Sequence, residues 1–175
     1  MSGWDFEVVI PGSPIGKGRP RGTAAGGFVR LYTPKKTADW ERSAALIARN
    51  AWMDAPLDKC AIEVEVVAVF HRPKRLMRKK DPDGVIWKTS KPDGDNICKC
   101  VLDSLVMAGI LRDDSCVVSI RILDFYAEKD RGPRVCIRLR SVGVEPVEGW
   151  WERKGKTLVE VFDENEHKFV DDLPW

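Results

Sequence analysis

Apolar and polar residues alternate in several short stretches of the chain, and this period of two is typical of β-strands. It is clearest in residues 61–70, where valine, isoleucine and alanine alternate with two glutamates. The segments predicted to be strands are residues 6–10, 28–32, 61–70, 116–126 and 134–140. We expect the first two to pair as a hairpin around a long glycine-rich loop, and the last two to be joined by a charged turn.

Apolar residues recur at helical spacing in two further stretches. In residues 37–53 they are Trp40, Ala44, Ile47, Ala48 and Ala51. Residues 95–106 have the same pattern, and Gly109 lies just beyond them as a stop signal. The order of these elements predicts an α+β domain over residues 1–140, built from a small mixed sheet and two main helices.

The charge of the chain is divided between a basic body and an acidic tail, although the net charge is only +2. Residues 141–175 hold four lysines and arginines against nine acidic residues, a net charge of −5, which leaves +7 for residues 1–140. A basic body favours a polyanionic partner. We expect residues 141–175 to form an acidic C-terminal extension with a small hairpin around residues 150–162.

Composition and motifs disfavour several other classes of protein. No apolar run approaches the ~20 residues of a membrane span, and the first residues lack a secretory signal pattern. The five cysteines are scattered without a CxxC pair, which favours reduced thiols in a cytoplasmic protein.

Residues 12–18 resemble a P-loop, but the glycine spacing is one short and no Ser or Thr follows Lys17. The two histidines, His71 and His167, give little basis for a histidine-metal nuclease or a Ser-His-Asp hydrolase.

The segment 91–114 carries the candidate chemistry. On a helix that begins at Asp95, the residues Asp95, Lys99 and Asp103 follow at i, i+4 and i+8 and therefore share one face. Apolar residues occupy the opposite face, which is expected to pack against the core. Asp93 lies two residues earlier in a Pro-Asp-Gly turn, so its carboxylate can point the same way as that of Asp95.

Two further aspartates, Asp113 and Asp114, follow the helix by one short turn, and the hypothesis is that they return to the same spot. Mg²⁺ prefers oxygen ligands from one or two carboxylates, with waters and substrate phosphate as the remainder. Clustered aspartates beside a lysine in basic surroundings predict metal-assisted cleavage of a nucleic-acid phosphodiester. Each aspartate also has a simpler interpretation: Asp95 as a helix N-cap, Asp93 as a turn former, and the later pair as a solvated turn.

The same segment closely resembles the signature of a known nuclease family. Its motif residues are Lys91, Pro92, Asp93, Gly94, Asp95, Asn96, Lys99, Leu102, Asp103, Leu105, Gly109, Asp113 and Asp114. Upstream, residues 10–14, 17–21 and 32–34 also fit the pattern. Over residues 5–140 the chain resembles the RusA family of Holliday-junction resolvases, which are endodeoxyribonucleases common in phages and prophages.

The resemblance implies an α/β homodimer that binds four-way DNA junctions and cuts two strands symmetrically in recombination and repair, in a bacterial or phage-infected cell. It also implies Mg²⁺ as the cofactor, with Mn²⁺ as a substitute. By motif position, the metal-binding catalytic carboxylates are those of Asp93, Asp95 and Asp114. Lys99 is the expected catalytic lysine, and Asp113 and Asn96 are expected to support the ligands. Two equivalent subunits suit a substrate with two-fold symmetry.

Basic residues upstream of the motif fit a DNA substrate. Those predicted to contact phosphates are Lys17, Arg19, Arg21, Arg72, Lys74, Arg75, Arg78, Lys79 and Lys80. Such contacts give an affinity that falls steeply with salt and carry little sequence information. Two alternatives stay open: a catalytically inactive protein that only binds junctions, and a nuclease for other branched DNA or for RNA. The extension 141–175 departs from the minimal family pattern, and its negative charge argues against DNA contact.

Overall fold

The structure is a computed structural model that describes residues 3–25, 28–57 and 61–142. Its strands are β1 (Phe6–Pro11), β2 (Arg21–Ala25), β3 (Phe28–Tyr32), β4 (Ala61–Phe70), β5 (Ile86–Trp87), β6 (Val117–Tyr126) and β7 (Arg134–Val142). Its helices are α1 (Lys35–Ala51) and α2 (Gly94–Met107), with short 3-10 helices η1 (Lys74–Leu76) and η2 (Asp114–Cys116). No helix in these described ranges is long and apolar enough to cross a membrane.

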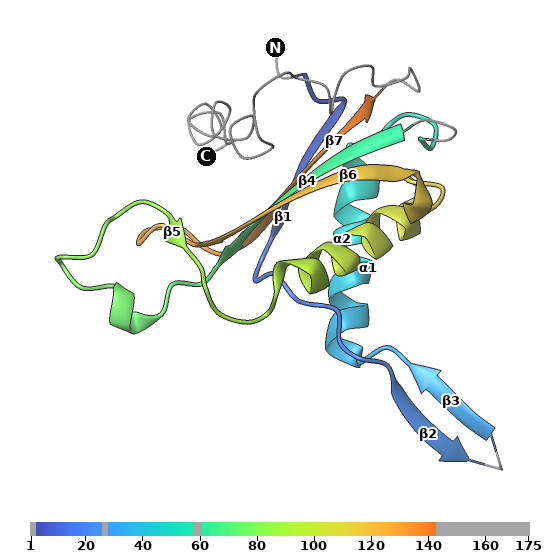
Figure 1. Cartoon of the computed structure of the whole chain (residues 1–175), viewed down its shortest axis with the longest axis horizontal. Helices are drawn as coiled ribbons and strands as arrows, with labels where there is room; N and C mark the ends of the chain where they lie inside the picture. The colour runs from blue at the N-terminus through green and yellow to red at the C-terminus, as the bar shows by residue number, and fades with distance from the viewer. Residues whose placement is uncertain (1–2, 26–27, 58–60, 143–175) are drawn as a thin grey trace, which may run out of the picture. The chain divides into compact units, whose positions relative to one another are not determined.

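Five strands form a mixed sheet in the order β1-β7-β4-β6-β5 (Figure 1). The pairs β1–β7, β4–β7 and β5–β6 are antiparallel, whereas β4 and β6 are parallel. A parallel pair needs a crossover connection, and the chain between β4 and β6 supplies one that contains α2. The predicted α+β fold, with a small mixed sheet and two main helices, is confirmed.

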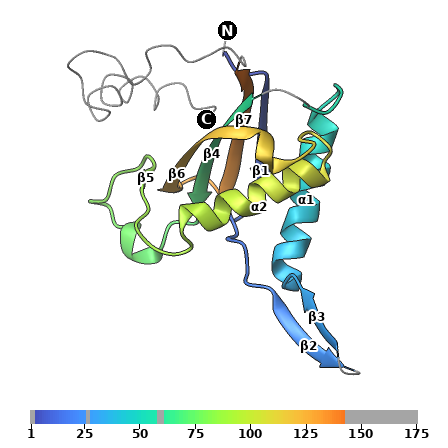
Figure 2. The ribbon, with the colours of Figure 1, turned by 45° about the vertical axis from the view of Figure 1, so that its right-hand side comes forward.

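One predicted pairing of strands was wrong. β1 pairs with β7 rather than with β3, and β3 pairs with β2 in a separate two-stranded sheet. β2, which has the sequence Arg-Gly-Thr-Ala-Ala, was predicted to be loop because it lacks large apolar residues. The consecutive strands β6 and β7 are joined by the predicted charged turn, and β4 lies between them in the sheet. The β2–β3 hairpin projects from the start of α1, as both ribbon views show (Figures 1 and 2).

The core lies between one face of the sheet and the two helices (Figure 2). The sheet contributes alternate residues of its strands, and α1 contributes small residues that let it approach closely. Core side chains include Phe6, Val8, Ile10, Ala44, Ala48, Val64, Val66, Ile137 and Leu139. The predicted apolar face of α2 is confirmed, with Ile97, Val101 and Leu105 fully buried, and this packing turns Asp95 and Lys99 outward.

The opposite face of the sheet carries charged residues in register. Glu7 pairs across the sheet with Arg138, Arg138 with Glu65, and Glu65 with Arg121. The Glu65 carboxylate lies 3.5 Å from Nη1 of Arg138 and 3.9 Å from Nε of Arg121. Burial raises the pKa of Glu65, and Arg138 and Arg121 oppose that rise. Opposite charges thus alternate across four strands and offset part of the cost of their burial.

The predicted extension, residues 141–175, falls mostly outside the described residues, which end at Val142. Its predicted hairpin around residues 150–162 therefore stays a prediction, as does the predicted domain boundary after residue 140.

Candidate active site

The N-terminus of α2 presents the first two motif aspartates. Asp93 occupies the N-cap position in an extended conformation, Gly94 begins the helix, and Asp95 lies in the first turn. The interpretation of Asp95 as the N-cap is therefore wrong. The Asp93 side chain makes no capping hydrogen bond, and both aspartates are exposed. Neither carboxylate is committed to holding the helix end, so both are free to bind a ligand.

Lys99 lies one helical turn after Asp95, and its Nζ is 3.3 Å from Asp95 Oδ2. Both side chains are about two-thirds exposed, at 63% for Lys99 and 64% for Asp95. An exposed i,i+4 ion pair of this kind contributes little to stability, because water screens both charges. The pair therefore presents an ammonium and a carboxylate side by side on the surface, beside Asp93.

The turn that carries Asp93 is held by close approach of two other segments. A Cβ at Gly94 would lie 3.0 Å from Cγ2 of Ile122 on β6, and a Cβ at Gly16 would lie 2.9 Å from Cβ of Pro92. The backbone N–H of Lys17 donates to the Asn96 carbonyl over 2.8 Å. Glycine is needed at positions 16 and 94 because any side chain there would push the turn away from its supports.

Asp124 is a residue near this turn that the sequence-based reasoning missed. It lies on β6 in phase with Ile122, so its side chain points to the helix side of the sheet, next to Gly94. Burial raises the pKa of Asp124; the nearby Lys88 ammonium opposes this rise and the charge of Asp93 adds to it. The available signal was an acid in phase with Ile120 and Ile122, on the otherwise apolar side of β6.

The later pair of aspartates follows the C-terminal end of α2, at the start of η2. Asp113 precedes η2 and accepts a hydrogen bond from the Ser115 N–H over 2.9 Å. Hydrogen bonds from the side chain and then from the backbone of Ser115 lower the pKa of the Asp113 carboxyl. Asp114 is exposed at the start of η2. α2 has 14 residues, so its two ends are ~20 Å apart. Asp114 therefore lies far from Asp93 within one chain.

This separation corrects the hypothesis that all the motif aspartates meet at one spot of the same protomer. Within residues 3–25, 28–57 and 61–142, no three His, Cys, Asp or Glu side chains are close enough together to hold a metal ion. The N-terminal end of α2 offers two carboxylates, and the third ligand predicted from the motif does not reach them. A complete three-carboxylate site needs a contribution from elsewhere.

A second charged cluster attaches the N-terminal loop to both helices. The Lys17 ammonium donates to Glu41 Oε1 on α1 over 2.6 Å and also to the Asp103 carboxylate on α2. Glu41 is buried and also accepts from the Cys100 thiol over 3.6 Å. Burial alone would lower the pKa of Lys17, but the hydrogen bonds to Asp103 and Glu41 outweigh it and raise that pKa. Asp103 is thus paired with Lys17 and does not join Asp93 and Asp95 at the start of α2.

We expect Lys17→Met to lower the melting temperature by about 4–8 °C at neutral pH. The variant leaves the buried Glu41 without its counter-ion, which costs about 2 kcal/mol. Because the pKa of Lys17 is raised in the fold, the stabilisation is complete below the ordinary lysine pKa and is lost only as pH rises through the raised value. Thermal unfolding checks this, with the exposed Lys36→Met as the matched control. Equal melting temperatures for the two variants would contradict the proposed role of the cluster.

Comparison with known proteins tests the family resemblance that the motif residues suggested. The family model of endodeoxyribonuclease RusA matches residues 11–140, which is most of the chain. This protein belongs to the RusA family. The resemblance inferred from the motif is confirmed, and the nuclease class expected from the carboxylates is that of the family. The chain is also 32% identical over 142 residues to the uncharacterized protein YqaN of Bacillus subtilis (strain 168), covering 78% of this chain and 96% of that relative.

The basic residues of this RusA-family chain divide into surface and structural groups. The exposed ones among those predicted to bind DNA are Arg19, Arg21, Lys74, Arg75, Arg78, Lys79 and Lys80. Arg72 is buried, and its guanidinium donates to the carbonyls of Ala127, Pro82 and Gly84. The expected phosphate contact of Arg72 is therefore corrected: its charge holds the long loop after β4 in place. Lys17 is likewise engaged with Glu41 and Asp103.

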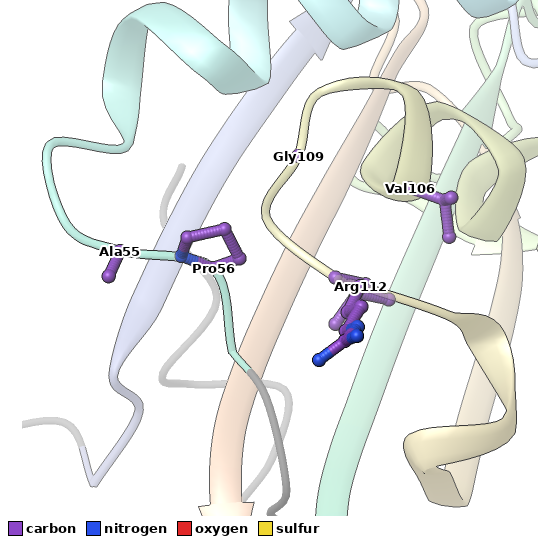
Figure 3. A pocket seen from close by; sticks show the side chains of 6 residues that line it. Ala55, Pro56, Val106, Gly109 and Arg112 are labelled. Atoms are coloured by element: carbon purple, nitrogen blue, oxygen red, sulfur yellow. The ribbon is translucent and has the colours of Figure 1, made fainter.

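An open pocket of about 570 Å³ lies where the segment after α1 passes the end of α2. Figure 3 shows Ala55 and Pro56 on one side and Val106, Gly109 and Arg112 on the other, and Leu111 completes the lining. No motif carboxylate lines it. The pocket is therefore separate from the surface formed by Asp93, Asp95 and Lys99.

Proposed function

We propose that this RusA-family protein is a metal-dependent endodeoxyribonuclease that resolves four-way DNA junctions by paired, symmetric nicks in recombination and repair. The observation that carries the proposal is the exposed group of Asp93, Asp95 and Lys99 at the N-terminus of α2, in a chain that matches the RusA family over residues 11–140. Two uncommitted carboxylates and an ammonium on an open surface suit a large polyanionic substrate better than a small-molecule one.

The donor set fits a hard divalent cation. Asp93 and Asp95 supply carboxylate oxygens, and the nearby cysteines Cys98 and Cys100 are buried with raised pKa values of about 11 and about 12, so they stay protonated and do not compete. In both cases burial is the main cause of the raised pKa. Oxygen-only ligation favours Mg²⁺, with Mn²⁺ as a substitute. When bound, the ion supplies charge neutralisation at the scissile phosphate.

A homodimer with shared sites accounts for the distance between the motif aspartates. Asp93 and Asp95 of one subunit would be joined by Asp114 of the partner subunit, and the two-fold axis would generate a second, equivalent site. The proposal is supported by the ~20 Å length of α2, which separates these residues within one chain. Two equivalent sites suit a junction in which two strands of like polarity are cut.

Of the remaining motif residues, one acts on the substrate and two hold the segments that carry the aspartates. Lys99 would stabilise the negative charge that develops on the phosphate, since its ammonium is exposed beside Asp95. Asn96 follows Asp95 and lies against Gly16. Its backbone carbonyl accepts a hydrogen bond from the Lys17 N–H, and this bond fixes the first turn of α2. Asp113 orders the η2 turn on which Asp114 lies, through its bond to Ser115.

Two exposed basic segments would follow the DNA backbone. One is the projecting hairpin with Arg19 just before it and Arg21 at its start; the other is residues 74–80 of the loop after β4. The loop has a defined shape because Arg72 and Lys129 bind its carbonyls from inside. A preformed basic loop loses little conformational entropy when it binds phosphates. Contacts to phosphates also carry little information about the DNA sequence.

The test is cleavage of three substrates of equal length: a synthetic four-way junction, a linear duplex and an RNA strand, each with Mg²⁺ and with EDTA. We expect paired nicks confined to the junction in Mg²⁺ or Mn²⁺ and none in EDTA. Junction binding without cleavage in either metal would favour the inactive architectural protein. Preferred cleavage of RNA or of other branched DNA would assign the chain to another nuclease activity.

A further inference from the structure

Lys88 is a buried lysine beside the candidate active site whose charge the proposed reaction does not use. It follows β5, and only 2% of its side chain is exposed. Its ammonium donates to the carbonyls of Ser90 and Pro92, over 2.9 Å to the latter. It also lies 4.2 Å from the centre of the Phe70 ring and 3.9 Å from Asp124 Oδ2. Burying an ammonium is costly, so these partners must offset a large desolvation penalty.

The two carbonyls that Lys88 binds lie on the segment that leads directly to Asp93. Ser90 precedes Lys91, and Pro92 immediately precedes Asp93. The Lys88 ammonium therefore binds the backbone on both sides of Lys91. Lys88 also donates its backbone N–H to the Asp124 carbonyl over 2.9 Å, which ties it to β6. The ammonium therefore connects the central sheet to the backbone that orients the Asp93 carboxylate.

We propose that Lys88 is a positioning residue for the nuclease reaction, with Asp124 as its counter-ion, and that its bonds to Ser90 and Pro92 fix the place of the Asp93 carboxylate. The inference rests on the proposed function, because it assumes that Asp93 is a metal ligand. Lys88 itself does not touch substrate. A buried ion pair is often replaceable by apolar residues without loss of stability, so this pair is retained for what it orients.

The experiment separates orientation from stability. Lys88→Met keeps the apolar stem but leaves the Asp124 carboxylate buried without a counter-ion, so both melting temperature and cleavage rate should fall. The double variant Lys88→Met/Asp124→Leu removes both charges, and we expect its melting temperature to return close to the wild-type value. Its junction cleavage and its affinity for Mn²⁺ should nevertheless stay about 10- to 100-fold lower, as is usual when a residue that orients metal ligands is lost.

Asp124→Asn serves as the matched variant, because it keeps the Lys88 bonds to Ser90 and Pro92. We expect it to lose less cleavage activity than Lys88→Met, because the amide removes the counter-ion but leaves the Lys88 ammonium bound to the Ser90 and Pro92 carbonyls. Junction cleavage is measured at saturating DNA, and Mn²⁺ binding is measured separately by titration calorimetry. A double variant that cleaves and binds Mn²⁺ like wild type would overturn the inference, as would an Asp124→Asn variant as impaired as Lys88→Met.

The outcomes for wild-type protein keep this inference distinct from the proposed function. Wild-type protein that leaves junctions intact in Mg²⁺ and Mn²⁺ overturns the resolvase proposal itself. The effect of Lys88 on Mn²⁺ affinity is then still decided by calorimetry. Wild-type protein that cleaves, together with a double variant of equal rate, overturns the role of Lys88 alone.

Discussion

Asp95→Asn should slow junction cleavage by about 10²- to 10³-fold while leaving junction affinity unchanged. The substitution removes one negative charge from the proposed metal site and keeps the shape of the side chain. The Asp95 side chain forms an exposed ion pair with Lys99, and losing such a pair costs the fold little. Single-turnover cleavage at saturating enzyme and a separate binding assay in Ca²⁺ measure the two quantities independently.

The matched control for this experiment is Asp130→Asn. Asp130 is an exposed aspartate in the turn between β6 and β7, so its removal makes the same change of net charge outside the candidate site. We expect the control to cleave at the wild-type rate and both variants to melt within about 2 °C of wild type, because surface substitutions seldom cost more than ~0.5 kcal/mol. Cleavage by Asp95→Asn at the rate of the control would remove Asp95 from the site.

The sequence predicted those parts of the fold that follow from local pattern. The run of Val, Ile and Ala residues around Glu63 and Glu65 predicted the bounds of β4 correctly, because this central strand is buried on both faces over most of its length. The helical spacing of apolar residues located α2 to within one residue at each end. The pairing of the strands was not predictable from local pattern. β1 and β7 are far apart in the chain, and no local feature of residues 6–11 specifies which strand covers them.

In the candidate site too, the contacts within one helix were predictable from the sequence, whereas those between distant segments were not. The spacing of Asp93, Asp95 and Lys99 placed them together because they lie at the N-cap and in the first two turns of one helix. The distance to Asp114 depends on the direction in which α2 runs beside β6, which a motif does not record. Lys88 and Asp124 were missed for a related reason: Lys88 follows β5, Asp124 lies on β6, and the pairing of these two strands brings them together.

The separation of Asp95 and Asp114 by α2 predicts the behaviour of mixed dimers. Suppose each site takes Asp93 and Asp95 from one subunit and Asp114 from the partner subunit. A heterodimer of Asp95→Asn and Asp114→Asn subunits then has one site with both substitutions and one site with neither. If each site were built within a single subunit, both sites of the same heterodimer would be damaged. The two arrangements therefore give opposite results with the same pair of inactive proteins.

We expect two inactive variants, Asp95→Asn and Asp114→Asn, to regain cleavage when they are co-expressed and purified through a different tag on each subunit. The product should be a junction nicked on one strand, since each heterodimer has a single intact site; in an unfractionated mixture about a quarter of all sites should be active. The control heterodimer, Asp93→Asn with Asp95→Asn, should stay inactive, because both substitutions lie on the same half of a shared site. No recovery in the first heterodimer would mean that Asp114 does not complete the partner's site, and the ligand set would then have to be sought within one subunit around Asp93 and Asp95.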